Sequence, residues 1–156
     1  MQLARMRYLQ NEPRNITYKI RQMLLALKLE TRMSKGEILD EYLHRVYLGS
    51  GTFGFAAAAQ RYFATPVSLL TDAQQTLLIA LLPSPEASNP LTHPDHAKNQ
   101  RDLVLEKLAD KDIIDPSRLD ELRSAPLTLN PSHESVVTAP HFALRMYDKV
   151  TDMGLT

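Results

Sequence analysis

Apolar residues recur at helical spacing in two neighbouring stretches near the start of this 156-residue chain. A period of three to four residues is typical of an amphipathic helix, whose apolar side chains share one face. In the first stretch this face consists of Ile16, Ile20, Met23, Leu24 and Leu27. In the second it consists of Ile38, Leu39, Tyr42, Leu43 and Val46, opposite Glu37, Asp40, Glu41, His44 and Arg45. The pattern therefore predicts two consecutive helices.

A short polar turn separates these helices, and a glycine-rich loop follows them. Ser34 and Glu37 have the spacing of a capping box, in which each side chain binds a free backbone N–H group at the start of a helix. The loop at residues 49–54 (GSGTFG) has three glycines, so its backbone is free to take positive φ or to approach a ligand closely. It lacks the residue spacing and the preceding strand of a phosphate-binding loop.

The remaining pattern predicts further helices and almost no strand. Thr71 is a helix-start signal, and residues 77–82 are apolar all round, which is typical of a helix at the centre of a core. The other predicted helices lie at residues 2–8, at 56–63, after Pro94, from Pro116 and at 141–150. Residues 124–139 are polar and rich in proline, as in a linker. The predicted fold class is all-α.

Composition narrows the class of protein without identifying it. The chain is 44% apolar and 23% charged, as expected for a globular domain, and 18 basic residues balance 18 acidic ones. This balance disfavours a dedicated nucleic-acid binder. With no cysteine there is neither a disulfide nor thiolate chemistry. The longest apolar runs are far shorter than the roughly 20 residues of a transmembrane helix.

Local chemistry alone leaves several alternatives open. Arg5, Arg14 and Lys19 are suited to holding an anion, but local chemistry alone favours solvated surface charge as their explanation. Asp40 and His44 are four residues apart, which suits either an acid–base pair or an exposed ion pair. The two histidines at 93 and 96 lack the further ligands that a zinc site needs.

The order of six segments changes this assessment, because each resembles a motif of family 51 glycosyltransferases, the peptidoglycan-building domains of bifunctional penicillin-binding proteins. Residues 2–5 (QLAR) match the end of STITQQLA followed by Lys or Arg, 18–22 (YKIRQ) match RKxxE, and 34–44 (SKGEILDEYLH) match KxxILExYLN. Residues 49–63 resemble the GxGxYG stretch that ends in YFG, 81–90 resemble LPxAPSxxNP, and 100–105 (QRDLVL) resemble RRxxVL. Together the matches span about two thirds of the chain.

The resemblance implies a lysozyme-like helical fold and the polymerisation of lipid II. In this family the 4-hydroxyl of one lipid-linked disaccharide attacks the anomeric carbon of the growing chain, with inversion and release of polyprenyl diphosphate. The implied substrate-binding residues are Gln2, Arg5 and Arg14, and the implied catalytic positions are Lys19 and Gln22. A divalent cation, Mg²⁺ or Mn²⁺, bound with the diphosphate is left open.

The chain also departs from the family pattern. The family's first motif, EDxxFxxHxG, supplies the principal glutamate base and has no counterpart here, so we expect a domain truncated at its N-terminus. Gln22 stands at the family's second glutamate, as in the 1C branch, whose motif is GKxRQ. The alternative is a non-catalytic helical module that binds glycan or a cell-wall synthesis partner.

The resemblance also predicts domain organisation and location. We expect residues 1–123 to be the C-terminal portion of the glycosyltransferase domain and residues 124–156 to be a linker leading into a following region. The expected partners are lipid II, the growing glycan chain and cell-wall synthesis proteins, with no nucleic acid. The expected location is the periplasmic face of the bacterial inner membrane. Apolar residues of the two opening helices would either rest on that membrane or pack in the core.

Overall fold

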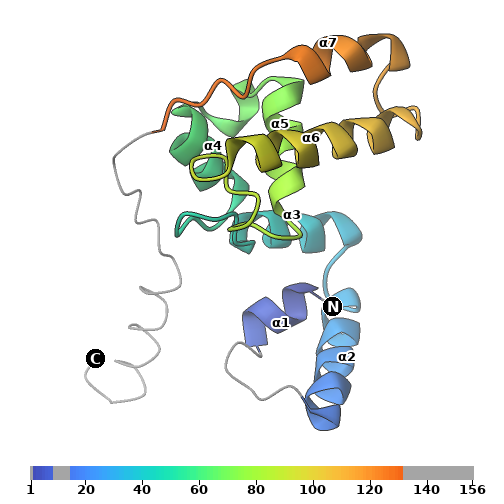
Figure 1. Cartoon of the computed structure of the whole chain (residues 1–156). Coiled ribbons are helices and arrows are strands. Elements are labelled where there is room, and N and C mark those ends of the chain that lie inside the picture. Colours follow the sequence, from blue (N-terminus) through green and yellow to red (C-terminus); the bar gives the residue numbers. More distant parts are fainter. Residues whose placement is uncertain (1, 9–14, 132–156) are drawn as a thin grey trace.

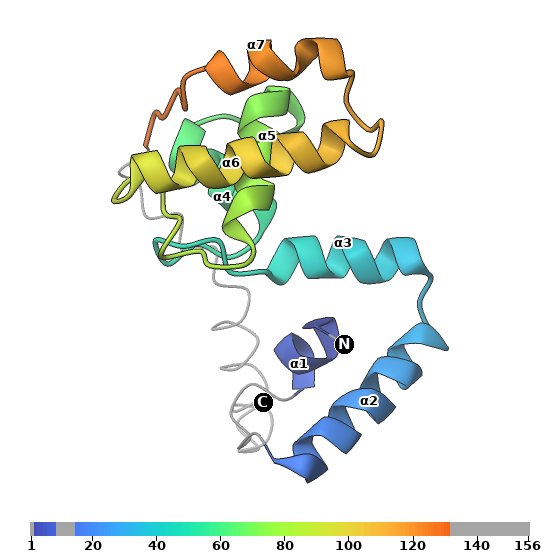
Figure 2. The ribbon, with the colours of Figure 1, turned by 45° about the vertical axis from the view of Figure 1, so that its right-hand side comes forward.

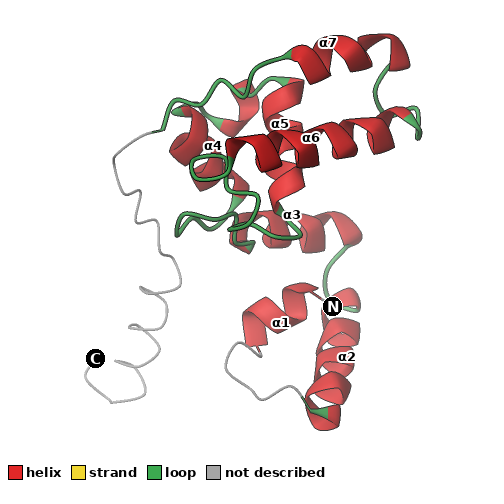
Figure 3. Cartoon of the chain, viewed as in Figure 1, coloured by secondary structure: helices red, strands yellow, loops and turns green. Residues whose placement is uncertain are grey.

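The computed structural model describes residues 2–8 and 15–131, and of Arg5 and Arg7 only the backbone. Helices make up its regular structure, and no strand occurs within the described ranges (Figures 1 and 3). In chain order the elements are α1 (Gln2–Tyr8), α2 (Ile16–Glu30), α3 (Lys35–Arg45), α4 (Phe55–Phe63), η1 (Val67–Leu69), α5 (Asp72–Leu81), α6 (Pro94–Ala109), η2 (Pro116–Arg118) and α7 (Leu119–Ser124). The predicted all-α class is confirmed. The helix predicted at 141–150 lies outside the described residues.

Side-chain caps explain where several helices begin. Ser34 accepts a hydrogen bond from the backbone N–H of Glu37, and the Glu37 carboxylate accepts one from the N–H of Ser34, so the predicted capping box is present. Thr71 and Gln74 form a second capping box at the start of α5. Asn15 caps α2 by accepting from the N–H of Tyr18 at 2.8 Å. Each cap satisfies backbone donors that a helix start leaves unpaired.

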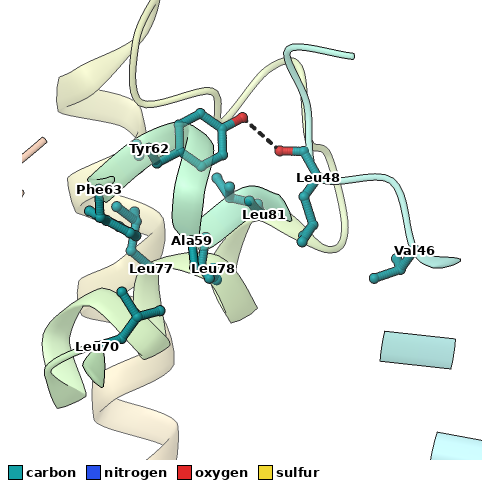
Figure 4. Packing of buried hydrophobic residues seen from close by; sticks show 11 residues of the cluster. Val46, Leu48, Ala59, Tyr62, Phe63, Leu70, Leu77, Leu78 and Leu81 are labelled. Atoms are coloured by element: carbon teal, nitrogen blue, oxygen red, sulfur yellow. Dashed lines mark hydrogen bonds between the residues drawn. The ribbon is translucent and has the colours of Figure 1, made fainter. Parts of the chain in front are cut away.

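Helices α4 to α7 form the main body of the molecule, with α5 near its centre (Figures 1 and 2). Its largest cluster of buried residues combines α4, α5 and α6 with the segments before and after α4 (Figure 4): Val46, Leu48, Ala58, Ala59, Tyr62, Phe63, Leu70, Leu77, Leu78, Leu81 and Ala97. Three leucines of α5 are at most 1% exposed, as the apolar run at 77–82 predicted, whereas Ile79 is 40% exposed.

A second buried cluster holds α5, α6 and α7 together through Ala73, Leu105 and Leu122. Beside it lies Arg101, which is 1% exposed. Its guanidinium donates to the carbonyl oxygens of Ala125 at 2.7 Å and of Arg123 at 2.8 Å, and to the Asp102 carboxylate. An arginine can remain buried when its charge is paired and its donors are used. Arg101 therefore ties the end of α7 to α6.

Helices α1, α2 and α3 form a smaller group beside the body (Figure 2). Helix α1 contacts both α2 and α3. Leu3, Ala4 and Leu29 are buried between them, and Ile38 of α3 packs against this cluster. Farther along α3, Tyr42 packs against the core of the body. Helix α3 therefore links the two parts.

The apolar face predicted for α2 does not lie in a core within the described part of the chain. Its residues remain largely exposed: Ile16 is 79% exposed, Ile20 53%, Met23 60%, Leu24 62% and Leu27 60%. The α2 side chains that pack against α1 and α3 come from the opposite face, with Leu25, Ala26 and Leu29. The core-packing interpretation of this apolar face is therefore wrong for the described residues. We call these five residues the α2 apolar face.

Candidate active site

Helices α1 and α2 carry most of the predicted site residues, and the structure packs these two helices together. Gln2 is exposed at the start of α1. Arg5 lies in the middle of α1, but its side chain is not described, and Arg14 lies outside the described residues. The predicted convergence of Arg5, Arg14 and Lys19 on one anion therefore stays a prediction.

Lys19 and Gln22 lie one turn apart in the first half of α2. Residues three apart in a helix share a face, so both side chains can be presented to one ligand. Lys19 is exposed and Gln22 is half-buried. At 100° per residue, Lys19 lies on the border between the packed face of α2 and the α2 apolar face, whereas Gln22 lies on the packed face, between Ala26 and Leu29. An ionic or polar ligand held by Lys19 would lie directly beside an exposed apolar surface.

The glycine-rich loop after α3 folds back on itself. Tyr47 and Phe53 form an isolated antiparallel bridge, and the N–H of Gly54 donates to the Val46 carbonyl at 2.8 Å. Gly49 has φ +88°, and a Cβ there would lie 2.8 Å from the Pro85 carbonyl oxygen and 2.9 Å from the Tyr62 hydroxyl. The prediction of positive φ is confirmed, and the close approach at Gly49 is to the protein's own backbone.

The proline-rich loop at residues 83–90 is hydrogen-bonded to this glycine-rich loop. The Tyr47 hydroxyl donates to the Glu86 carboxylate, and the Asn89 amide donates to the Ser50 hydroxyl at 2.9 Å. The hydrogen bond from Tyr47 lowers the pKa of Glu86, while burial and Glu86 raise the pKa of Tyr47. The bonds join positions 39 residues apart.

Sequence reasoning missed this arrangement of side chains. The ring of Phe53, which is 50% exposed, lies 5.0 Å from the ring of Tyr47 between centroids. An aromatic pair of which Phe53 is exposed, beside an ionised carboxylate, offers apolar contact and hydrogen bonding to a polar ligand such as a sugar. The only sequence signal was that both loops lie on family motifs.

The other candidate groups have simpler explanations. His44 Nδ1 lies 3.6 Å from an Asp40 carboxylate oxygen and 2.8 Å from the Asp40 carbonyl oxygen, and both side chains are largely exposed. The shorter contact is to the backbone of α3, and the side-chain contact has the geometry of an exposed ion pair when the imidazole is protonated. Within residues 2–8 and 15–131, no three His, Cys, Asp or Glu side chains gather as metal ligands. A divalent cation bound with a diphosphate stays open.

Comparison with known proteins identifies the class. The transglycosylase family profile matches residues 1–109, which is well over half of the chain. This range contains α1 to α6, including both loops of the site. The chain therefore belongs to the transglycosylase family, as the order of its motifs predicted.

Particular relatives show which proteins carry this domain. Penicillin-binding protein 1A of Aquifex aeolicus is 38% identical over 133 residues, covering 85% of this chain and 18% of the relative. Penicillin-binding protein 1A of Escherichia coli is 34% identical over 143 residues, covering 91% and 17%. A putative transglycosylase of Cupriavidus necator is 34% identical, covering 83% and 55%. The chain thus spans from about a sixth to about half of the length of these relatives.

The fold is also similar to a solved structure. The crystal structure of penicillin-binding protein 1A from Haemophilus influenzae has a TM-score of 0.61 and 27% identity, covering 78% of this chain and 18% of that one. This similarity agrees with an all-α, lysozyme-like glycosyltransferase domain. The more specific assignment to the 1C branch stays a prediction. Among the described helices, none has the length and apolar character needed to cross a membrane.

Proposed function

We propose that this chain belongs to a peptidoglycan glycosyltransferase that polymerises lipid II, inverting the anomeric carbon and releasing polyprenyl diphosphate. The observation that carries the proposal is the transglycosylase match over residues 1–109. The packing of α1 against α2 supports it, because these helices bear the predicted substrate-binding and catalytic positions.

The proposed roles follow from where charge develops. The departing diphosphate gains negative charge, so fixed cations there stabilise the transition state more than the bound substrate. Lys19, Arg5 and Arg14 would supply that positive charge, and Gln2 would donate a hydrogen bond. Gln22 is a neutral amide, so it would orient the diphosphate by hydrogen bonding. The proton of the attacking hydroxyl would pass to a carboxylate base, which the family's first motif supplies.

A polymerisation assay with the complete protein and lipid II tests this function. We expect Lys19→Ala to reduce the rate by about 100-fold or more, because removal of one oxyanion-stabilising donor has effects of this order. Lys107→Ala is the matched control, since Lys107 is an exposed lysine of α6 that lies outside the six family motifs. Equal rates in wild type, control and Lys19→Ala would contradict the role of Lys19.

A binding module is the second candidate function, and Gln22 is the observation that favours it. An amide cannot accept a proton as a carboxylate does. In this case the complete protein would bind lipid II but form no polymer. Restoring the carboxylate with Gln22→Glu distinguishes the two: a gain of polymerisation from an inactive wild type identifies an inactivated enzyme, and an active wild type excludes the module.

We further propose that the α2 apolar face rests on the membrane surface that holds the lipid-linked substrate. Five apolar side chains on one face, each at least half exposed, form the kind of surface that lipid or protein covers. Lys19 lies on one flank, and Arg21 and Lys28 lie on the other, all exposed. Basic residues beside an apolar face favour an anionic lipid surface. The inner membrane would be that surface.

Flotation with phosphatidylglycerol-containing vesicles tests the membrane contact. We expect Met23→Ser combined with Leu24→Ser to weaken binding at least about tenfold, because each buried apolar side chain contributes roughly 1.5 kcal/mol or more. The control combines Val67→Ser with Leu69→Ser, which removes two apolar residues, 41% and 70% exposed, outside α2. An equal loss of vesicle binding in the two double variants would contradict a specific role of α2 in membrane contact.

A further inference from the structure

The chain does not leave the body at the end of α7. Residues 125–130 continue without regular secondary structure, and Thr128 has a left-handed backbone with φ +47°. Leu127 and Leu129, on either side of it, are half-buried, whereas Pro126, Thr128 and Asn130 are exposed. Leu127 and Leu129 both pack against the cluster that contains Tyr62 and Leu48. We call residues 125–130 the strap.

Hydrogen bonds fix the strap at both ends. At its start, the buried Arg101 guanidinium donates to the Ala125 carbonyl at 2.7 Å. At its end, the N–H of Asn130 donates to the Tyr62 carbonyl at 2.9 Å. Arginine suits the first position because its rigid fork of donors binds several acceptors at once, here also the carbonyl of Arg123 and the carboxylate of Asp102.

Tyr62 connects the strap to the glycine-rich loop. Its backbone accepts from the strap, while its buried side-chain hydroxyl donates to the Leu48 carbonyl at 2.8 Å (Figure 4). The same hydroxyl would lie 2.9 Å from a Cβ at Gly49, so the ring fills the space directly behind the loop. If the backbone of Tyr62 shifts, either its ring or the glycine-rich loop must shift as well, because the closely packed contact between them leaves no free space.

We propose that the strap holds the glycine-rich loop in place through Tyr62, so that the order of this loop depends on Arg101. Detachment of the strap would then loosen Tyr62 and the backbone of residues 46–54. This inference does not depend on the proposed function, since it concerns the order of the protein without substrate.

Native-state hydrogen exchange of the full chain, followed at single amides, tests the coupling. Lysine at position 101 keeps the charge near Asp102 but lacks the planar fork of donors with which arginine binds both carbonyls and the carboxylate, so Arg101→Lys should detach the strap. We expect the amides of Asn130, Leu48 and Gly54 to exchange about tenfold faster or more, because several charge-assisted hydrogen bonds are lost. The amides of α2 should keep their rates. Faster exchange at Asn130 with unchanged rates at Leu48 and Gly54 would overturn the proposal.

Two further variants keep the test decisive if Arg101→Lys loosens the whole body. Asn130→Pro removes the N–H that donates to the Tyr62 carbonyl at the far end of the strap and leaves Arg101 in place. It should again accelerate exchange at Leu48 and Gly54; unchanged rates would overturn the proposal. In a Tyr62→Phe background, Arg101→Lys should add less than about twofold at Leu48, since the connecting hydroxyl is gone. If the effects of Tyr62→Phe and Arg101→Lys on exchange at Leu48 were fully additive, the two residues would act independently, and the proposal would again be overturned.

Discussion

Helices α2 and α5 contain the same kinds of apolar residues and yet have opposite surroundings. Leu77, Leu78 and Leu81 of α5 are at most 1% exposed, whereas Leu24 and Leu27 of α2 are about 60% exposed. Helix α5 lies among α4, α6 and α7, while the contacts of α2 within the described part of the chain are mainly with α1 and α3. Periodicity tells which residues share a face, but the neighbours decide what covers that face.

The largest expected effect is the difference in stability loss between a leucine substitution in α5 and one in α2. Leu78→Ala in the body should lower the free energy of unfolding by about 2–5 kcal/mol, because it leaves a cavity in a closely packed core. Leu24→Ala, the matched change on α2, should change it by about 0.5 kcal/mol or less. Urea unfolding of both variants measures the difference. Equal losses would mean that the α2 apolar face is covered in solution.

Two glycine substitutions extend the comparison to the glycine-rich loop, which lies between α3 and α4. Gly49→Ala should destabilise by about 2–4 kcal/mol, because it combines a left-handed backbone with a clash against Pro85 and Tyr62. Gly51→Ala has the same backbone handedness but nothing within 4 Å of the new Cβ, so about 1–2 kcal/mol is expected. Thermal unfolding of both variants gives the ranking. A reversed order would contradict the contact at Gly49.

The buried ion pair of α6 should make the body sensitive to acid. Partial burial acts to raise the pKa of Asp102, but hydrogen bonds from Lys98 and Arg101 outweigh it, and the pKa is lowered. A lowered pKa in the folded state contributes stability above the ordinary value of about 3.9 and loses it as the pH falls through the folded value. We therefore expect Asp102→Asn to cost about 1–2 kcal/mol at pH 7.

The pH dependence of this difference is the control. Below the folded pKa of Asp102 both carboxyl and amide are neutral, so wild type and Asp102→Asn should converge in urea unfolding at low pH. A constant difference from neutral to acidic pH would mean that the ionised carboxylate contributes nothing. Asp120→Asn, which changes an exposed carboxylate in the first turn of α7, should show little difference at any pH.

The smallest expected effect concerns a helix start in the N-terminal group. Ser34→Ala removes the capping box of α3 and should lower stability by about 1 kcal/mol, because the N–H of Glu37 loses its acceptor. Ser34→Gly should recover most of this loss, since glycine is also tolerated at that position. Calorimetry of the two variants tests it. Equal melting temperatures in Ser34→Ala and wild type would contradict a contribution from the cap.

Local interactions made much of the fold predictable from the sequence. The capping box at Ser34 and the apolar run of α5 depend on residues within one or two turns, and both are present in the structure. The family, too, was predictable, because motif order is a property of the chain itself. The role of each site residue was not, since Arg5 and Lys19 act together only if separate helices bring their side chains to one ligand.

Tertiary structure alone decided the contacts between distant segments. No spacing rule relates Tyr47 to Glu86, or Arg101 to the carbonyl of Ala125, because these pairs lie 39 and 24 residues apart. The exposure of the α2 apolar face was equally hidden, since a helical stripe looks the same whether a core or a membrane covers it. The sequence determined which residues lie together on each helix; the packing of helices against one another determined which of those faces meet protein.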